Sequence, residues 1–287
     1  MKHAAQFLST LQTYAYPTFG NWPVSDITAD DVLKAVLPIW GIKHETATRV
    51  LQRIKKVLTW SAVARYREPL RSDFWDYVHG KLPAVSVEEK HHEACPYDEA
   101  GALLLRVLNS SASDVVKLAF MLTVLTAARS GETRGATWDE IKLTEKVWEV
   151  PASRMKAGRP HSVPLSDGAL AVLGRVRALS DSKTLVFPSP RGVKLSDMAF
   201  TQLLRRLEAG CTMHGFRSTF RDWAADQTDY AAQTCEAALA HVNEDKVEGA
   251  YLRSDLFKKR RALMADWAAF LESSAKGYDI GHTVEAE

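Results

Sequence analysis

The most informative stretch of the chain is residues 211–255, which read CTMHGFRSTFRDWAADQTDYAAQTCEAALAHVNEDKVEGAYLRSD. His214 and Arg217 are three residues apart, so on a helix they share one face, and a single phosphate-sized anion could contact both. His241 follows, and Tyr251 lies ten positions after it. We interpret this stretch as the centre of a functional site to which the rest of the chain contributes.

The composition is that of a globular protein with a substantial core. The chain has 287 residues, of which 46% are apolar and 25% charged, enough for one large domain or two of ordinary size. No apolar run approaches the roughly 18 to 20 residues of a membrane span, and the amino terminus turns polar too early for a secretory signal, so we expect no membrane partner and a cytoplasmic location. The three cysteines form no C-x-x-C pair, so neither a disulfide framework nor a zinc site is indicated.

The charge balance is compatible with DNA binding but is not evidence for it. The formal net charge is only +2. Residues 1–90 hold 12 Lys and Arg against 9 Asp and Glu, so the basic excess lies in the first third of the chain.

Helical patterns fill the first part of the chain, and we expect a helical domain over residues 1–85. Thr28 is a candidate cap for one helix, with Asp31 in its first turn. Another helix, over residues 45–65, places apolar residues on one stripe and cations on its other faces. These cations, which as an alternative form an ordinary solvated surface, are candidates for DNA binding: Arg49, Arg53, Lys55 and Lys56. The periodicity lapses afterwards, and we expect a linker at residues 86–95.

The second domain is expected over residues 96–287. Helices are indicated around residues 98–108, 115–127, 170–179, 198–208 and 256–276, and short β-like segments at 141–143, 147–150 and 162–165. Residues 115–127 are apolar nearly all round, which favours a buried central helix. The fold class is therefore mainly α with a small antiparallel β-sheet (α+β).

Further polar residues outside residues 211–255 stand out. Arg129 directly follows the buried helix, where a guanidinium needs an anion, and Glu132 could orient it; the plain alternative is a structural salt bridge. Lys156 lies in the turn RMKAGRP, where a lysine is ordinarily just solvated. Taken singly, His214 and His241 could be structural histidines and Tyr251 a half-buried aromatic residue.

Taken together, six residues resemble the active site of the tyrosine recombinases, the phage integrase family, and the prophage and genomic-island branch is most similar. The six are Arg129, Lys156, His214, Arg217, His241 and Tyr251. The similar segments, in order, are TAARSGETRGATWDEI, RMKAGRPHSVPLS, TMHGFRSTFRDWA, ALAHV and KVEGAYLRSDL. The resemblance covers the second domain, and the helical first domain resembles, more weakly, the family's core-binding domain. An arm-binding domain that usually precedes it in this branch is expected to be missing.

The residue types suit in-line cleavage of a phosphodiester. Tyr251 would attack and form a 3′-phosphotyrosine, which keeps the bond energy for rejoining. Arg129 and Arg217 offer forked donors to the non-bridging oxygens. No cluster of acidic residues and histidines has metal-ligand spacing, so we expect neither a metal nor another cofactor.

The resemblance implies further roles. In the family, the counterpart of Lys156 protonates the 5′-hydroxyl leaving group, that of His214 assists proton transfer from the tyrosine, and that of His241 donates to the phosphate. Two more candidates for contact with DNA are Lys90 and His161.

The resemblance also implies partners. Family members bind double-stranded DNA attachment sites, assemble into tetramers and exchange strands through a Holliday junction, with accessory DNA-bending or directionality proteins as possible helpers. We thus expect an integrase that integrates or excises a mobile element at the nucleoid. The helix at residues 256–271 would then pack on a neighbouring protomer, or alternatively on its own domain. Two other functions stay open, a type IB topoisomerase and a DNA-binding regulator without catalysis.

Overall fold

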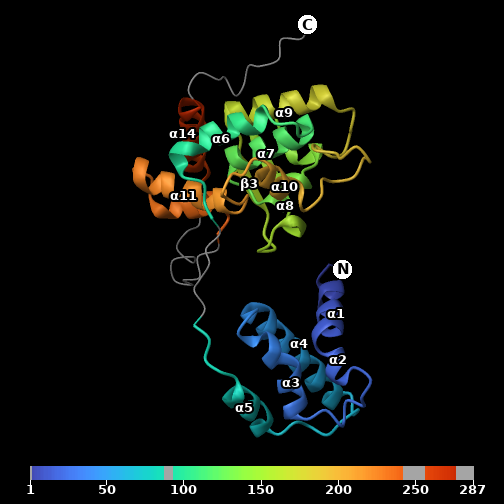
Figure 1. Cartoon of the computed structure of the whole chain (residues 1–287). Coiled ribbons are helices and arrows are strands. Elements are labelled where there is room, and N and C mark those ends of the chain that lie inside the picture. The colour runs from blue at the N-terminus through green and yellow to red at the C-terminus, as the bar shows by residue number, and fades with distance from the viewer. Residues whose placement is uncertain (1, 87–92, 242–255, 276–287) are drawn as a thin grey trace. The chain divides into compact units, whose positions relative to one another are not determined.

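The computed structural model describes residues 2–86, 93–241 and 256–275, and the chain forms two compact units, residues 1–90 and 91–287 (Figure 1). Helices dominate both units, and the described strands form one three-stranded antiparallel sheet. The α+β class expected from the sequence is therefore confirmed. No helix among the described residues is long and apolar enough to cross a membrane.

The first unit is a helical domain with its own apolar core. Val32, Val36, Val50, Ile54 and Leu58 are all at most 2% exposed in it. Its helices are α1 (Lys2–Tyr14), α2 (Tyr16–Phe19), α3 (Ala29–Trp40), α4 (His44–Val63) and α5 (Ser72–Lys81).

The first turn of α3 has the cap expected from the sequence. The Thr28 hydroxyl accepts from the backbone N–H of Asp31, and the Asp31 carboxylate accepts from the backbone N–H of Thr28. This reciprocal pair satisfies donors that a helix start leaves open. At the other end of α3, Trp40 Nε1 donates to the carbonyl oxygen of Pro83 (2.8 Å), which fastens the chain after α5 to this unit.

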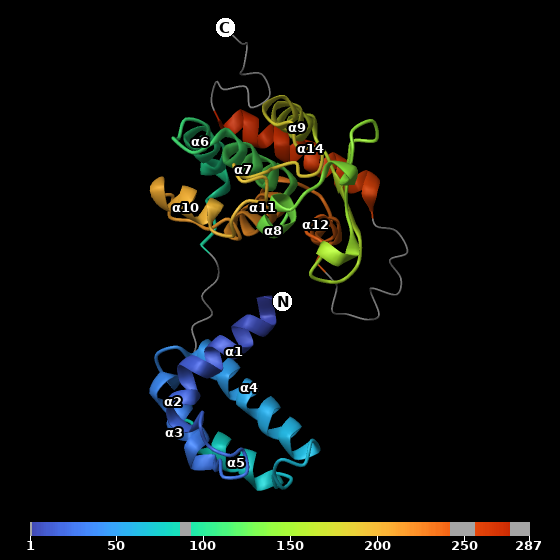
Figure 2. The ribbon, with the colours of Figure 1, turned by 90° about the vertical axis from the view of Figure 1, so that its right-hand side faces the viewer.

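The second unit packs its helices around α7 (Asp114–Thr126). Every residue from 118 to 126 is buried, which confirms the expectation of a central helix. Neighbouring helices cover it on several sides (Figures 1 and 2). They are α6 (Tyr97–Leu108), α8 (Ser130–Arg134), α9 (Asp167–Leu179), α10 (Ala199–Arg206) and α14 (Phe257–Ser274), while α11 (Gly215–Gln227) and α12 (Ala232–Ala238) complete the unit.

The sheet has the order β1-β2-β3, with β1 at Ile141–Lys142, β2 at Val147–Val150 and β3 at His161–Pro164. Val150 pairs with His161, so the loop 151–160 connects β2 to β3 (Figure 2). Glu140, 8% exposed, accepts from Trp148 Nε1 (2.9 Å) and pairs with Arg154. Arg154 also donates to the carbonyl oxygen of Glu132, and it therefore ties the sheet to α8.

Helix α14 packs within its own unit. Met264, Trp267 and Leu271 are at most 1% exposed, and Trp267 Nε1 donates to the carbonyl oxygen of Val124 in α7 (2.9 Å). The sequence left open whether this helix packs on a neighbouring protomer or on its own domain. In the structure, Phe257–Ser274 packs on its own domain.

Candidate active site

Arg129 stands at the corner between α7 and α8. Ala127 ends α7 in the left-handed conformation (φ 48°), which turns the chain so that Arg129 precedes the first turn of α8. The carboxylate of Glu132 accepts from the backbone N–H of Arg129 (2.9 Å) and from its Nη1 (3.0 Å). Glu132 is 5% exposed, whereas the Arg129 side chain is 23% exposed. The carboxylate therefore orients the guanidinium, and within residues 2–86, 93–241 and 256–275 its other N–H groups stay available.

Arg217, on the first turns of α11, is fixed from two sides. Its Nη1 donates to the carbonyl oxygen of Ala127 (2.6 Å) and its Nη2 to that of Leu239 (2.5 Å). Burial, and to a lesser degree the nearby charge of Arg129, lower the pKa of Arg217 to about 10. The two arginines that the sequence places 88 positions apart thus lie within each other's electrostatic range in one site.

His241 follows the end of α12 and completes this cluster. Ala240 is left-handed (φ 49°), and the backbone N–H of His241 donates to the carbonyl oxygen of Glu236 (3.0 Å), the pattern of a Schellman cap. The imidazole Nε2 lies 3.0 Å from Nη2 of Arg217, and Nδ1 lies 2.6 Å from Oε2 of Glu236. The cap thus directs the ring toward Arg217.

His214 is exposed directly before α11, next to an unusually close backbone approach. Thr212 donates from its backbone N–H to the carbonyl oxygen of Glu93 (2.9 Å). A Cβ on Gly215 would lie 2.0 Å from that same oxygen, so only glycine fits there. The segment that leads into the second unit is therefore laid against the turn that carries His214.

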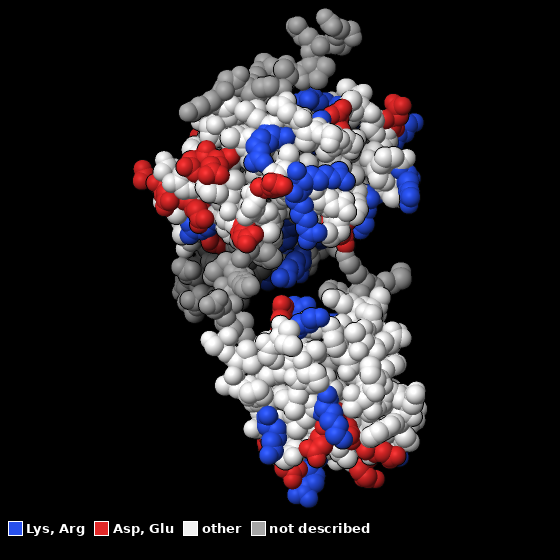
Figure 3. Space-filling model, in the orientation of Figure 1, with Lys and Arg blue, Asp and Glu red and all other residues white. Residues whose placement is uncertain are grey.

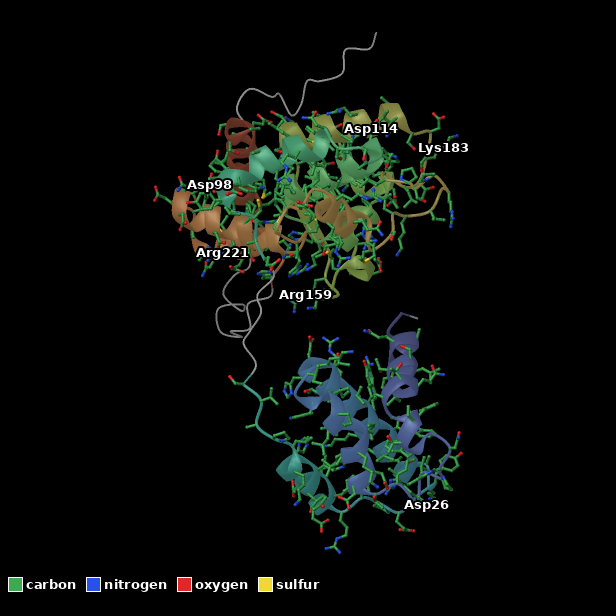
Figure 4. The ribbon with its side chains drawn as sticks, in the orientation of Figure 1. Asp26, Asp98, Asp114, Arg159, Lys183 and Arg221 are labelled. Carbon is green, nitrogen blue, oxygen red and sulfur yellow. The ribbon has the colours of Figure 1, made fainter. Side chains whose placement is uncertain are left out.

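Lys156 lies in the loop 151–160 and is exposed. Arg159 of the same loop is labelled in Figure 4, where it lies at the edge of the second unit. Gly158, with φ 65°, supplies the turn. Within the described residues Lys156 makes no ion pair, so its ammonium group is available to a ligand.

His161, at the start of β3, lies near the Arg129 corner. Burial and, after it, the charge of Arg260 lower its pKa to about 4 against the opposing charge of Glu132, so the ring is neutral at neutral pH. Arg260 on α14 is 1% exposed and donates to the carbonyl oxygen of Ser162 (2.7 Å). The half-buried His161 thus lines the site, and its contact with DNA stays a prediction.

The other candidates are distributed as follows. Tyr251 and Lys90 lie outside the described residues. Arg49, Arg53 and Lys56 are spaced to lie on one side of α4, and Arg53 donates to the Gln6 carbonyl oxygen (3.0 Å). Lys55 lies on another side, with its Nζ 5.2 Å from the ring centre of Trp75. The DNA-binding role of these cations stays a prediction.

Charges of the second unit are unevenly placed. On the face drawn in Figure 3, Lys and Arg side chains gather across the middle, whereas Asp and Glu gather to one side, over α6 and α11. Arg205 and Arg206, in the last turn of α10, are both exposed. Among the described residues, no group of three or more His, Cys, Asp and Glu side chains is placed to hold a metal ion.

Sequence reasoning missed three residues of this site, Glu236, Arg221 and Arg260. Glu236 and Arg221 form an ion pair across α12 and α11 (2.8 Å), and Arg260 is buried beside β3. The five-residue spacing from Glu236 to His241 is visible in the sequence, but it becomes meaningful only with the left-handed Ala240 between them.

Residues 97–256 match the phage integrase family, and residues 1–73 match the phage integrase central domain. Two prophage integrases of Escherichia coli (strain K12) are similar: IntA is 30% identical over 280 residues, covering 96% of this chain and 66% of the relative, and IntZ is 31% identical over 290 residues, covering 99% and 69%. The chain thus spans about two thirds of the length of these relatives. The fold is similar to that of lambda integrase in a tetramer bound to a Holliday junction, with a TM-score of 0.64, 17% identity, and 86% of this chain and 73% of that chain covered.

All six predicted active-site residues lie within the matched residues 97–256. The structure describes five of them, and the sixth, Tyr251, lies outside the described residues. The chain belongs to the phage integrase family, the tyrosine recombinases.

Proposed function

We propose that this chain is a site-specific DNA recombinase that cleaves and rejoins DNA strands through a 3′-phosphotyrosine, and so integrates or excises a mobile element. The observation that carries the proposal is the convergence of Arg129 and Arg217. Two guanidiniums of like charge are held in one site, although burial and then the charge of Arg129 lower the pKa of Arg217. Such an arrangement is stabilised by an anion with several oxygens, and a phosphodiester supplies one.

Each residue has a role in the proposed reaction. Tyr251 attacks the phosphorus and displaces the 5′-oxygen, which Lys156 protonates to give the 5′-hydroxyl. Arg129 and Arg217 bind the non-bridging oxygens and stabilise the charge of the pentavalent transition state. His214 takes up the tyrosine proton, and His241 donates to a non-bridging oxygen. Glu132 keeps Arg129 oriented through the two hydrogen bonds that it accepts.

The proposed partners are double-stranded DNA attachment sites and further copies of this chain, which assemble into a tetramer on DNA. The shared fold with a lambda integrase tetramer bound to a Holliday junction supports this assembly. Accessory DNA-bending or directionality proteins belong to the same proposal, as does action at the nucleoid. A type IB topoisomerase and an inactive regulator are not favoured, because the matched relatives are integrases.

The test is covalent capture of DNA. The full chain and its Tyr251→Phe variant are incubated with a library of nicked duplex fragments from the source genome, and fragments that stay attached after denaturation are sequenced. The native chain should capture a defined sequence, whereas Tyr251→Phe should bind that sequence in a mobility-shift assay without becoming attached. Capture by Tyr251→Phe would refute the assignment of the nucleophile, and capture by neither protein would refute the recombinase proposal.

A further inference from the structure

The contacts of His241 define which of its ring nitrogens carries the proton. Nε2 lies 3.0 Å from Nη2 of Arg217, and a guanidinium nitrogen can only donate. Nε2 must therefore accept in this arrangement, which leaves the proton of the neutral ring on Nδ1. Nδ1 lies 2.6 Å from Oε2 of Glu236, a distance that suits a hydrogen bond donated to a carboxylate.

Glu236 is itself held in place. Its other oxygen, Oε1, accepts from Nε of Arg221 at 2.8 Å, and the carboxylate is about one-third exposed. Partial burial raises the pKa of Glu236, but the hydrogen bonds from Arg221 and His241 outweigh it and keep the pKa below its ordinary value. The group is thus a carboxylate at neutral pH, with its plane fixed by donors on both oxygens.

From this geometry we propose that Glu236 is a positioning residue of the recombination reaction, which acts through His241 and is itself anchored by Arg221. It holds the imidazole with the proton on Nδ1 and Nε2 toward the phosphate, and it stabilises the imidazolium that donates from Nε2 when the phosphate binds. The inference rests on the proposed function, because it assigns a partner to one of the proposed catalytic residues.

The same geometry explains how the site is kept ready for a phosphate. In the structure Nε2 of His241 accepts a hydrogen bond from one N–H of Arg217. An incoming non-bridging oxygen replaces Nε2 as the acceptor for Arg217, and a protonated Nε2 can then donate to that oxygen as well. The carboxylate behind Nδ1 keeps the ring oriented for this exchange, as in carboxylate–histidine pairs of other enzymes.

Other charged groups also lie near the pair of Glu236 and His241. Arg217 and Arg221 approach it from α11, while Arg129 and Glu132 act on Arg217 from the corner of α8. These residues stay unchanged in the Glu236 variants described next, so a change in cleavage rate reports on the carboxylate.

Glu236→Gln replaces one acceptor oxygen by an NH₂ group at nearly constant shape. The amide cannot accept from both Arg221 and His241, so either the anchor or the contact with Nδ1 is lost. Cleavage of the duplex captured by the native chain should fall about 10-fold to 100-fold at neutral pH. Glu236→Asp should recover part of the rate.

The matched control is Glu145→Gln, the same chemical change at an exposed carboxylate in the turn between β1 and β2. It should cleave at the native rate. A Glu236→Gln variant that behaves like this control would overturn the inference.

A second measurement does not depend on activity. Nitrogen-15 NMR of the histidine-labelled full chain, with the His241 signals assigned by their loss in His241→Asn, reports which ring nitrogen carries the proton. We expect Nδ1 in the native chain, and predominant protonation of Nε2 would refute the inference even if Glu236→Gln failed to fold. A chain that cleaves no DNA but shows the expected tautomer would instead refute the recombinase proposal and leave the placement of the ring by Glu236 intact.

Discussion

Arg217 donates from Nη1 to the carbonyl oxygen of Ala127 across 2.6 Å, although the two residues are 90 positions apart. Ala127 is the left-handed residue that ends α7, and Arg129 follows it by two residues. A guanidinium proposed for phosphate binding thus also fastens α11 to the corner that carries the other guanidinium. Arg217 therefore has both a structural role and a proposed role in phosphate binding, whereas the structural role of Arg129 is smaller.

Replacing either arginine by alanine should lower single-turnover cleavage by about 10²-fold to 10³-fold, because transition-state charge loses its donors. The two variants should differ in stability. Arg217→Ala leaves the buried carbonyl oxygens of Ala127 and Leu239 without this donor, and it should lower the free energy of unfolding by about 1–3 kcal/mol. Urea denaturation and cleavage assays measure the two effects, and a loss of cleavage below about tenfold in both variants would contradict the proposed role.

Lys156→Ala should separate chemistry from folding. Because Lys156 is exposed on the loop 151–160, the free energy of unfolding should stay within about 0.5 kcal/mol of the native value. Cleavage should fall about 10²-fold to 10⁴-fold if the ammonium protonates the leaving oxygen. A substrate with sulfur in place of that oxygen should restore the rate, since a thiolate leaves without a proton. Arg159→Ala on the same loop is the control, and equal losses in both variants would argue against a specific role for Lys156.

His161 should make the stability of the second unit depend on pH. Its pKa is lowered to about 4 in the native protein, mainly by burial, from the ordinary value of 6.5. Between these values only the unfolded chain takes up the proton, so stability is fully present above pH 6.5 and is lost as the pH falls toward 4. The loss should reach up to about 3 kcal/mol. Denaturation curves across this range should show a shallower pH dependence for His161→Gln, and identical slopes would disprove the contribution of His161.

Two glycines should respond in opposite ways to the same substitution. A Cβ at position 215 would lie 2.0 Å from the carbonyl oxygen of Glu93, so Gly215→Ala must displace backbone and should cost about 1–3 kcal/mol of unfolding free energy. Gly174 lies in α9 with nothing within 4 Å of its Cβ position, and Gly174→Ala should stabilise by about 1 kcal/mol through helix propensity. Thermal unfolding of both variants tests the pair. The close approach at Gly215 would be wrong if its variant were as stable as the native chain.

Many elements could be read from local sequence. The buried helix α7 is recognisable because its residues are apolar on nearly every side, and the cap of α3 because Thr28 and Asp31 have the required spacing. The proposed active-site residues were recognisable as a set because five motifs occur in the right order, whereas each residue alone had a plain structural explanation.

The sequence by itself determined the α+β class, the central helix and the family, because periodicity, capping and motif order are properties of neighbouring residues. Only the tertiary structure decided that Arg217 holds the Ala127 corner, that Glu236 and Arg221 stand behind His241, and that α14 packs on its own unit. Two of these contacts join residues 90 and 143 positions apart, and the Glu236 contact depends on a left-handed Ala240, a conformation that the residue type does not favour. Such contacts form when distant helices pack together, and no local pattern encodes which backbone oxygen or carboxylate a given side chain will then meet.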